Sequence, residues 1–293
     1  MSELRVPAAL DGWCILHRMF RFDRLRWDAC APEDRLRTTQ RAQTFIEGIS
    51  ADEQRDLALV GVLGGKADLM LVAYARSFDD LAMIEVAFDK LELRAFLSPG
   101  DSYVSILEMG LYEATARIDA ALRERGLEPD SAEWRAAFAA ALETEAKAPF
   151  IAPRLWARIP RRRYVCFYPM NKLRGESQNW YTLPYEERAR QMRDHGLIGR
   201  KYAGAVTQVI SGSIGFDDWE WGVDLYADDP LTFKRLVYEM RFDEASAKYG
   251  VFGPFVTGMQ FSPAQLAVWL DGSASPQLLE EQSGLPASKP VAS

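Results

Sequence analysis

Histidine is the scarcest residue type in this chain that could do chemistry, since His17 and His195 are the only two among 293 residues. Two imidazoles cannot form a three-histidine zinc site, and neither lies in the H-E-x-x-H pattern of zinc proteases. The three cysteines are odd in number and unclustered, which argues against a zinc knuckle or a disulfide framework. The cysteine pattern instead favours a reducing, cytoplasmic environment.

Other common motifs are absent from the sequence. There is no G-x-S-x-G elbow, no G-x-x-x-x-G-K-[ST] loop and no G-x-G-x-x-G turn, so hydrolase, P-loop and Rossmann functions lose their usual support. The 35 Lys and Arg against 42 Asp and Glu give a net charge of -7, which argues against nucleic acid as a partner. An anionic ligand would therefore have to be held by local cations.

Residues with chemical functions are concentrated between positions 164 and 255. Taken alone, His195 before Gly196 is typical of the C-terminal end of a helix, and Lys172 is typical of a solvated charge. Tyr168 is typical of aromatic packing at a strand end, where Pro169 is expected to stop the strand and direct the phenol into a cavity. The runs that attract attention are Tyr168-Pro-Met-Asn-Lys172, Asp194-His-Gly-Leu-Ile-Gly-Arg200 and Met240-Arg-Phe-Asp-Glu-Ala-Ser246.

Two similar series of elements must position these residues. In the first half, strand patterns over 12–20, 57–63, 68–75 and 102–108 surround helices over 32–49 and 77–96, in the order β-α-β-β-α-β. The second half repeats this order, with strands over 164–168, 206–210, 219–226 and 254–261 and helices over 184–194 and from 229 onward. We therefore predict an α+β fold of two tandem ferredoxin-like repeats that arose by internal duplication.

Segments outside the repeats have a different composition. Residues 115–148 are rich in Ala, Glu and Arg and predict one or two solvent-facing helices, while the composition after 271 predicts a disordered tail. No apolar run approaches the roughly 20 residues of a membrane span, so no membrane segment is expected. The predicted division is an N-terminal repeat (10–114), a helical connector (115–159), a C-terminal repeat (160–270) and a tail (271–293).

The three runs quoted above, in this order and spacing, resemble the coproheme decarboxylases of the chlorite dismutase-like superfamily. The resemblance extends from Gly12-Trp13 to Gly253, and residues 115–148 diverge from it in length and composition. It implies that the two repeats form a dimeric α+β barrel, with the porphyrin site in the C-terminal repeat. It also implies a homopentamer that makes a transient contact with the iron-inserting chelatase.

The resemblance further implies a reaction and a set of residues for it. Two propionates of iron coproporphyrin III (coproheme) would become vinyl groups, with hydrogen peroxide as oxidant and haem b as product. The iron porphyrin would be both substrate and redox centre. His195 would be the axial iron ligand, and Tyr168 would form the radical that attacks a propionate. Lys172 would be catalytic as well, and the matched substrate-binding residues are Tyr112, Arg154, Trp180, Gln208, Arg241 and Ser246.

Two other functions stay open. Chlorite dismutases place an arginine opposite the axial histidine, and this sequence has Gln208 there, whose neutral amide stabilises an anionic chlorine oxide less well than a guanidinium does. A haem-binding carrier or sensor without turnover would keep His195 but would not need Tyr168 and Lys172 together. Coproporphyrin carries four carboxylates, so several local cations are expected around it.

Overall fold

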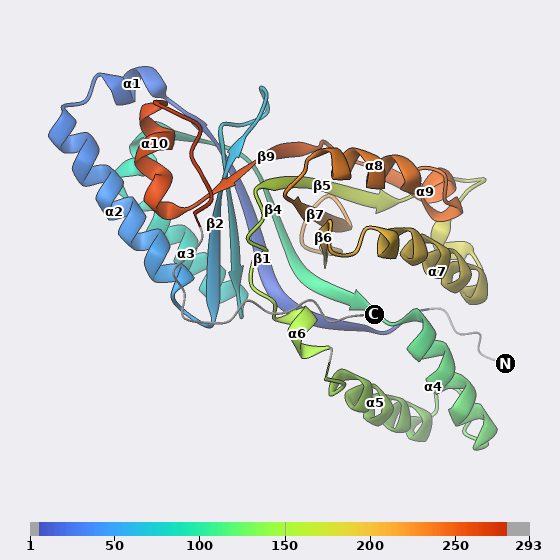
Figure 1. Cartoon of the computed structure of the whole chain (residues 1–293). Coiled ribbons are helices and arrows are strands. Elements are labelled where there is room, and N and C mark those ends of the chain that lie inside the picture. The colour runs from blue at the N-terminus through green and yellow to red at the C-terminus, as the bar shows by residue number, and fades with distance from the viewer. Residues whose placement is uncertain (1–5, 150, 280–293) are drawn as a thin grey trace.

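The computed structural model describes residues 6–149 and 151–279, and its framework is one antiparallel sheet (Figure 1). The strands are β1 (Ala9–Phe22), β2 (Arg55–Val62), β3 (Leu69–Ala75), β4 (Leu97–Gly110), β5 (Tyr164–Lys172), β6 (Thr207–Gly212), β7 (Trp221–Ala227), β8 (Gly250–Phe252) and β9 (Val256–Phe261). They are ordered β7-β6-β4-β1-β3-β2-β9-β5-β8, and β7 also pairs with β5. All of these strands except β8 therefore close into a ring.

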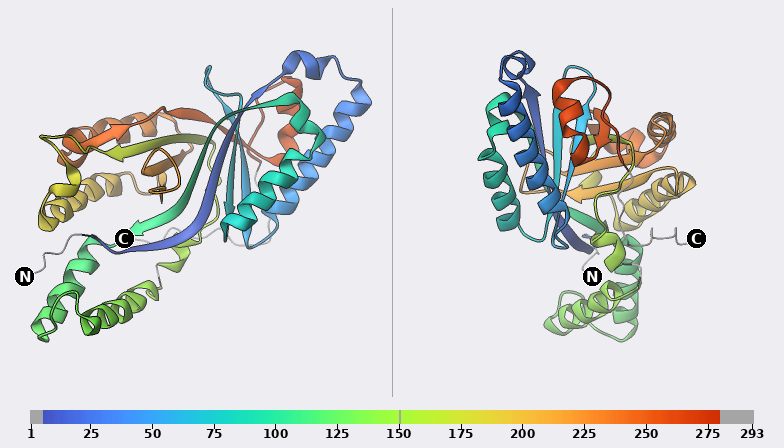
Figure 2. Two further views of the ribbon diagram at one scale, coloured as in Figure 1. Left: turned by 180° about the vertical axis from the view of Figure 1, so that it is seen from behind. Right: turned by 60° about the vertical axis from the view of Figure 1, so that its left-hand side comes forward.

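Helices cover the outside of this ring and extend beyond it. In both halves the main elements follow the order β-α-β-β-α-β. The helices are α1 (Arg24–Asp28), α2 (Pro32–Ser50), α3 (Phe78–Asp89), α4 (Tyr112–Glu124), α5 (Ala132–Ala146), α6 (Ala152–Leu155), α7 (Tyr185–Lys201), α8 (Leu231–Met240), α9 (Glu244–Tyr249) and α10 (Leu266–Asp271), with 3-10 turns η1 (Glu92–Phe96), η2 (Trp180–Thr182) and η3 (Pro263–Gln265). Helices α2, α3 and α10 lie beside the N-terminal strands, whereas α4 and α5 project away from the rest (Figure 2).

Neighbouring residues of β1 belong to two different cores, because successive side chains of a strand point to opposite faces. Ile15 packs inside the ring with Tyr74 and Phe167. Leu16 packs outside it, in a cluster that includes Ile46 of α2 and Ile84 of α3. The ring is thus filled by side chains and covered by helices.

His17 of β1 lies inside the ring and is fully buried. Its Nε2 is 3.0 Å from Oδ1 of Asp224 on β7, and both side chains are fully buried. The imidazole also stacks on Phe167, with the ring centroids 4.1 Å apart. His17 therefore connects the two halves of the chain, and its Nδ1 is buried without a hydrogen-bond partner among the described residues.

Two short seams join the N-terminal strands to the C-terminal strands. One pairs β4 with β6 at Ile106 and Leu107, and the other pairs β2 with β9 around Val60. At the second seam a Cβ on Gly258 would lie 2.5 Å from the carbonyl oxygen of Gly61. Glycine is required there because the two backbones approach too closely for any side chain.

Helix α7 is longer than predicted, and this corrects the interpretation of His195 as a residue at a helix end. The helix continues through Gly196 and Gly199 and ends at Lys201. A glycine inside a helix costs about 1 kcal/mol relative to alanine, so it weakens a helix without terminating it. His195 therefore lies inside the helix.

Helix α3 is shorter than predicted. The sequence predicted a helix over 77–96, but α3 ends at Asp89 and a 3-10 turn follows.

Strand β5 also continues beyond its predicted end, since it runs through Pro169 to Lys172. The carbonyl of Pro169 accepts a hydrogen bond from the backbone N–H of Gly253, in the gap between β8 and β9. The nitrogen of Pro169 faces the same edge of β5 as its carbonyl, and on that edge the hydrogen-bonded pairing with β8 and β9 is already interrupted. The missing N–H of proline therefore costs no hydrogen bond to β7.

The connector and the start of the tail are ordered within the described residues. Helix α5 lies within the predicted connector, whereas α4 begins before it, at Tyr112, and the break between the two helices runs from Glu124 to Ala132. Before residue 280, the backbone N–H of Leu279 donates to Ser262 Oγ at 2.7 Å. The rest of the predicted disordered tail, 280–293, lies outside the described residues. Among the helices described here, none is both long and apolar enough to cross a membrane.

Candidate functional site

The imidazole of His195 is held in place by the N-terminal end of α9. Its Nδ1 donates to Oδ2 of Asp243 at 2.9 Å, and Oγ of Ser246 lies 3.5 Å from the same nitrogen. Asp243 is the N-cap of α9, and its other carboxylate oxygen accepts from the backbone N–H of Ser246 at 2.9 Å. With the proton on Nδ1, the lone pair of the neutral ring is on Nε2, which is the nitrogen a metal ion would bind.

The carboxylate of Asp243 is kept charged by its hydrogen bonds. Burial acts to raise its pKa, but the hydrogen bonds with His195 and Ser246 outweigh burial and hold the pKa below its usual value. An ionised carboxylate on Nδ1 fixes the orientation of the ring and makes Nε2 a stronger electron donor. Asp243 thus fixes the orientation of the His195 imidazole and leaves Nε2 as the nitrogen that a ligand could use.

Lys172 lies at the end of β5 and is largely buried. Its Nζ donates to the carbonyl of Ala245 at 3.2 Å and lies 4.5 Å from the ring centroid of Trp180. Burial lowers the pKa of Lys172 to about 8, and the negative charge of Asp243 opposes that shift. Such an ammonium group carries a charge at neutral pH that a nearby anion would stabilise.

Tyr168 lies four residues before Lys172 on the same strand, so both side chains are on one face. Its ring stacks on Phe255 with centroids 4.4 Å apart and lies 6.0 Å from the ring of Phe252. The guanidinium of Arg241 lies 3.6 Å from the Phe252 centroid. Burial raises the pKa of the Tyr168 phenol far above its usual value, despite the opposing charge of Arg241. The phenol therefore keeps its proton at neutral pH.

Tyr112 reaches the same region from the first turn of α4. The carbonyl of Tyr112 accepts a hydrogen bond from the hydroxyl of Tyr185 on α7 at 2.7 Å. Burial raises the pKa of the Tyr112 phenol, and hydrogen bonds with Trp180 and Arg188 act in the other direction. Tyr112, Trp180 and Lys172, which the sequence analysis selected separately, therefore lie next to one another.

Gln208 faces α7 from strand β6. A Cβ on Gly199 would lie 3.5 Å from Oε1 of Gln208, and Gly199 is one helical turn after His195. The amide is thus directed towards the helix that carries the histidine. Arg154 is different, because it lies exposed on α6 and makes no contact with His195, Tyr168 or Lys172 among the contacts found in the described residues.

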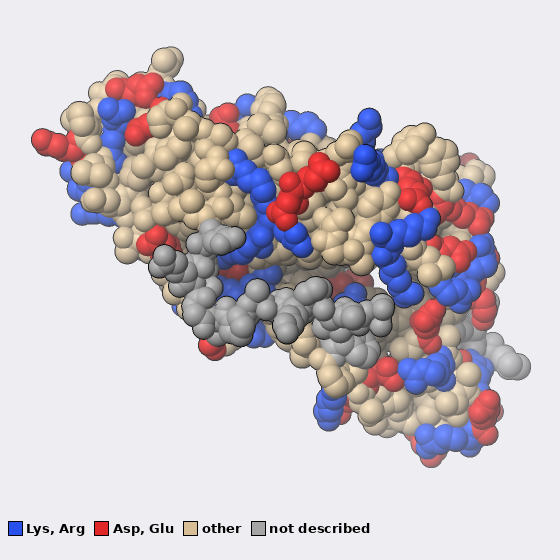
Figure 3. Space-filling model, viewed as in Figure 1, with Lys and Arg blue, Asp and Glu red and all other residues tan. Residues whose placement is uncertain are grey.

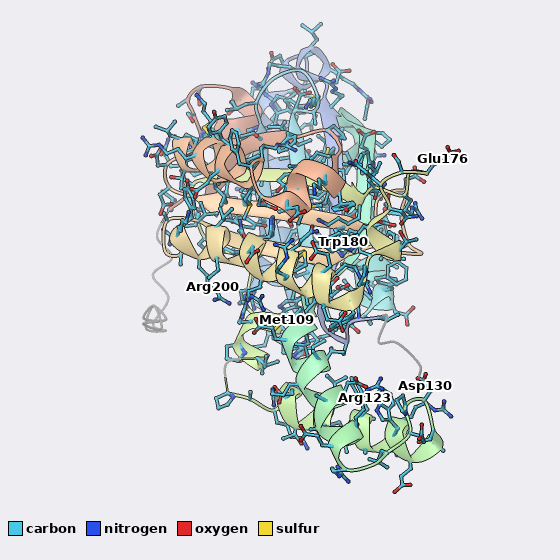
Figure 4. The ribbon with its side chains drawn as sticks, turned by 90° about the vertical axis from the view of Figure 1, so that its right-hand side faces the viewer. Met109, Arg123, Asp130, Glu176, Trp180 and Arg200 are labelled. Carbon is cyan, nitrogen blue, oxygen red and sulfur yellow. The ribbon has the colours of Figure 1, made fainter. Side chains whose placement is uncertain are left out.

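The surroundings of the site carry both signs of charge. In Figure 4, Trp180 lies at the level of α7, and Met109, near the end of β4, lies between α7 and the α4–α5 pair. Blue and red side chains are interspersed over the part of the surface formed by α7 to α9 (Figure 3). Surface ion pairs there include Arg190 with Glu187 and with Glu244.

Two residues of this site were not selected from the sequence. Asp243 could have been recognised as a helix N-cap, since Asp followed by Glu-Ala-Ser is a common start of a helix. Glu220 accepts hydrogen bonds from the backbone N–H of Lys172 at 3.1 Å and from the hydroxyl of Tyr181 at 2.6 Å. No sequence signal marks Glu220, because its partners come from a different strand and loop.

Comparison with known proteins shows which family this chain belongs to. The family model for chlorite dismutase matches residues 35–261. The chain belongs to the chlorite dismutase family. A coproheme decarboxylase from Staphylococcus saprophyticus is 42% identical over 257 residues, which cover 87% of this chain and 94% of that protein.

Solved structures of this chlorite dismutase family agree in fold. A heme-binding protein from Thermus thermophilus is 36% identical with a TM-score of 0.78, over 92% of this chain and 99% of that one. A mutant chlorite dismutase from Candidatus Nitrospira defluvii has a TM-score of 0.66 over 89% of this chain and 97% of that one, and at 18% identity it supports the fold alone. The prediction of an α+β, chlorite dismutase-like fold is confirmed.

Proposed function

We propose that this protein is a coproheme decarboxylase, which converts two propionates of iron coproporphyrin III to vinyl groups with hydrogen peroxide and releases haem b. The observation that carries the proposal is the 42% identity to a coproheme decarboxylase across 94% of that relative. The chemistry of the side chains gathered around α7 is consistent with this reaction. The iron porphyrin is then the substrate and also supplies the redox centre when it is bound.

The donor set around His195 fits an iron porphyrin. A porphyrin supplies the four equatorial nitrogens, so the protein needs to provide one axial ligand, and Nε2 of His195 has the tautomer and the carboxylate support for that role. Gln208 faces α7 from β6, and we place it opposite His195. Because the amide of Gln208 is neutral, it stabilises an anionic chlorine oxide poorly, and this disfavours chlorite dismutation.

Tyr168 is the proposed hydrogen-abstracting group. The iron porphyrin and peroxide would supply the oxidant when bound, and Tyr168 would give up an electron together with its phenolic proton. The phenoxyl oxygen then removes a hydrogen atom from the propionate carbon β to the carboxylate. Loss of a second electron breaks the bond to the carboxylate and leaves a vinyl group. For each propionate, one peroxide and one proton are consumed, and one CO₂ and two waters are formed.

Lys172 is proposed to position the reacting propionate. Its ammonium group lies on the same face of β5 as Tyr168 and beside Trp180, so a carboxylate held there would place its carbon chain near the phenol. Holding the reacting groups in the correct geometry is a large part of such catalysis. The remaining proposed substrate-binding residues are Tyr112, Arg154, Trp180, Arg241 and Ser246, of which Ser246 also donates to Asp243 at 3.0 Å.

We propose the finer architecture on the same basis. The repeated β-α-β-β-α-β order and the closed ring of strands support two tandem ferredoxin-like repeats in a dimeric α+β barrel. The corresponding units are 10–114 and 160–270, with a helical connector over 115–159 and a tail over 271–293. A cytoplasmic homopentamer that makes a transient contact with the iron-inserting chelatase completes the proposal.

Mixing the purified protein with ferric coproporphyrin III and hydrogen peroxide tests the function directly. Mass spectrometry of the porphyrin should show the stepwise loss of two carboxyl groups. Binding without any change in mass would indicate a carrier or sensor. Release of dioxygen from added chlorite, with the coproporphyrin intact, would indicate a chlorite dismutase.

A further inference from the structure

The buried face of α7 is polar, which is unusual for a helix packed against other elements. Amphipathic helices normally bury a stripe of apolar side chains, but the buried residues of α7 are Tyr185, Arg188 and Gln191. Gln191 Oε1 is moreover buried without a hydrogen-bond partner in the part of the chain that is described. Arginine is among the residues least often buried, so the position of Arg188 calls for an explanation.

Arg188 lies on the same helical face as His195. The two residues are seven positions apart, which is close to two turns of a helix and about 10 Å along its axis. Only 5% of Arg188 is exposed. Its guanidinium lies 5.7 Å from the ring centroid of Tyr185.

A chain of contacts connects Arg188 to the proposed catalytic lysine. The side chains of Arg188 and Trp180 lie close enough to the phenol of Tyr112 to lower its pKa, against the effect of burial, and the ring of Trp180 lies against Nζ of Lys172 at 4.5 Å. Two cations, a phenol and an indole N–H are thus brought together from α7, β5, α4 and η2. A guanidinium has five N–H donors in a fixed planar arrangement, so it can hold a phenol and a carboxylate at the same time.

We propose that Arg188 binds the carboxylate of a reacting propionate of coproheme and thereby makes the site prefer substrate over product. This inference rests on the proposed function. A carboxylate bound beside Lys172 would lie on the face of β5 that also carries Tyr168, and it is lost when the vinyl group forms. A buried arginine that loses a bound carboxylate loses part of the compensation for its charge, which weakens the binding of haem b.

The competing explanation is that Arg188 only braces Tyr112 and Tyr185. The two explanations differ in ligand dependence. A carboxylate-binding residue discriminates between porphyrins by their number of carboxylates, whereas a bracing residue affects all porphyrins alike.

Spectroscopic titration with ferric coproporphyrin III and with haem b separates these explanations. Arg188→Gln should weaken coproporphyrin binding about ten- to hundredfold, the typical loss for a charge-assisted hydrogen bond, and should weaken haem b binding much less. Arg193→Gln is the matched control, since it removes the same charge from an exposed position of the same helix. It should leave both affinities unchanged.

The ratio of the dissociation constants for haem b and for ferric coproporphyrin III distinguishes the two explanations even where a variant is less stable. Equal weakening for both porphyrins, or no weakening for coproporphyrin, would overturn the assignment. If Arg188→Gln does not fold, Arg188→Lys replaces it, because an ammonium keeps the charge but loses the two-point geometry and should still change the ratio. The peroxide reaction of the unaltered protein is run in parallel: binding without decarboxylation would refute the proposed function, while the affinity ratio still tests Arg188.

Discussion

Asp243 accepts the Nδ1 proton of His195 at 2.9 Å, although the two residues are 48 positions apart in the chain. This hydrogen bond joins the middle of α7 to the N-cap of α9. Because it forms within the protein itself, the orientation of the imidazole is set without a bound ligand.

Replacing His195 with alanine should change the absorption spectrum of the bound iron porphyrin, because the proposed axial nitrogen is removed. Affinity should fall without vanishing, since the carboxylates still anchor the ligand. His17→Ala should leave the spectrum of the folded protein unchanged but lower its stability by about 3–5 kcal/mol, because Asp224 then stays buried without its partner. Identical spectra for His195→Ala and the unaltered protein would remove His195 from the site.

Tyr168→Phe should retain coproheme binding and stop decarboxylation. The ring still fills its place between Phe255 and Phe252, but the oxidisable O–H is gone. Tyr164→Phe is the control on the same strand and should keep full activity. Binding by titration and product by mass spectrometry are measured for both variants, and near-normal product formation by Tyr168→Phe would end the radical assignment.

The affinity for coproheme should fall as the pH rises through about 8, the pKa to which burial lowers Lys172. Below that pH the side chain is charged and attracts a carboxylate, and above it the charge is lost. A bound carboxylate favours the charged form, so the midpoint in the complex should lie somewhat higher. Lys172→Arg should abolish the fall between pH 7 and about 9 because a guanidinium stays protonated, and an unchanged profile would argue that another group titrates.

Gly196→Ala and Gly199→Ala should both stabilise the porphyrin-free protein by about 0.5–1 kcal/mol, because alanine favours a helix over glycine. Only Gly199→Ala should weaken coproheme binding. A Cβ at Gly199 would lie 3.4 Å from Met240 Cε and 3.5 Å from Oε1 of Gln208, the residue proposed to lie opposite His195, so the added methyl group would take up space beside the proposed porphyrin site. Nothing lies within 4 Å of a Cβ at Gly196. Urea unfolding and titration measure the two effects, and equal affinities for the two variants would contradict the proposed place of the porphyrin.

Local patterns predicted much of the fold correctly. The strands predicted over 57–63 and 68–75 match β2 and β3, and between them Gly64 has a φ of +81°, which glycine tolerates best. The helix predicted over 32–49 matches α2, which begins at Pro32 and has Glu33 and Asp34 in its first turn. In both places the signal and the structure lie within a few residues of each other.

Other features could not be predicted because their causes lie far away in the chain. Pro169 is accommodated inside β5 by the gap between β8 and β9, and α7 passes through Gly196 because its neighbours α8 and α9 pack against it. For the candidate site, the sequence selected Tyr112, Trp180 and Lys172, which the fold brings together. It could not select Arg188 or Glu220, since a buried charge and a solvated one look the same in a sequence.

The two seams that close the strand ring also bear on how the chain folds and how it responds to cutting. Leu59 pairs with Phe261 and Ile106 pairs with Gly212, so the ring closes only after most of the chain has been synthesised. Such distant pairings are slow to form. The loop between α4 and α5 lies outside the ring. A protease that cuts this loop should therefore yield two fragments that stay together as one folded body and separate only in denaturant.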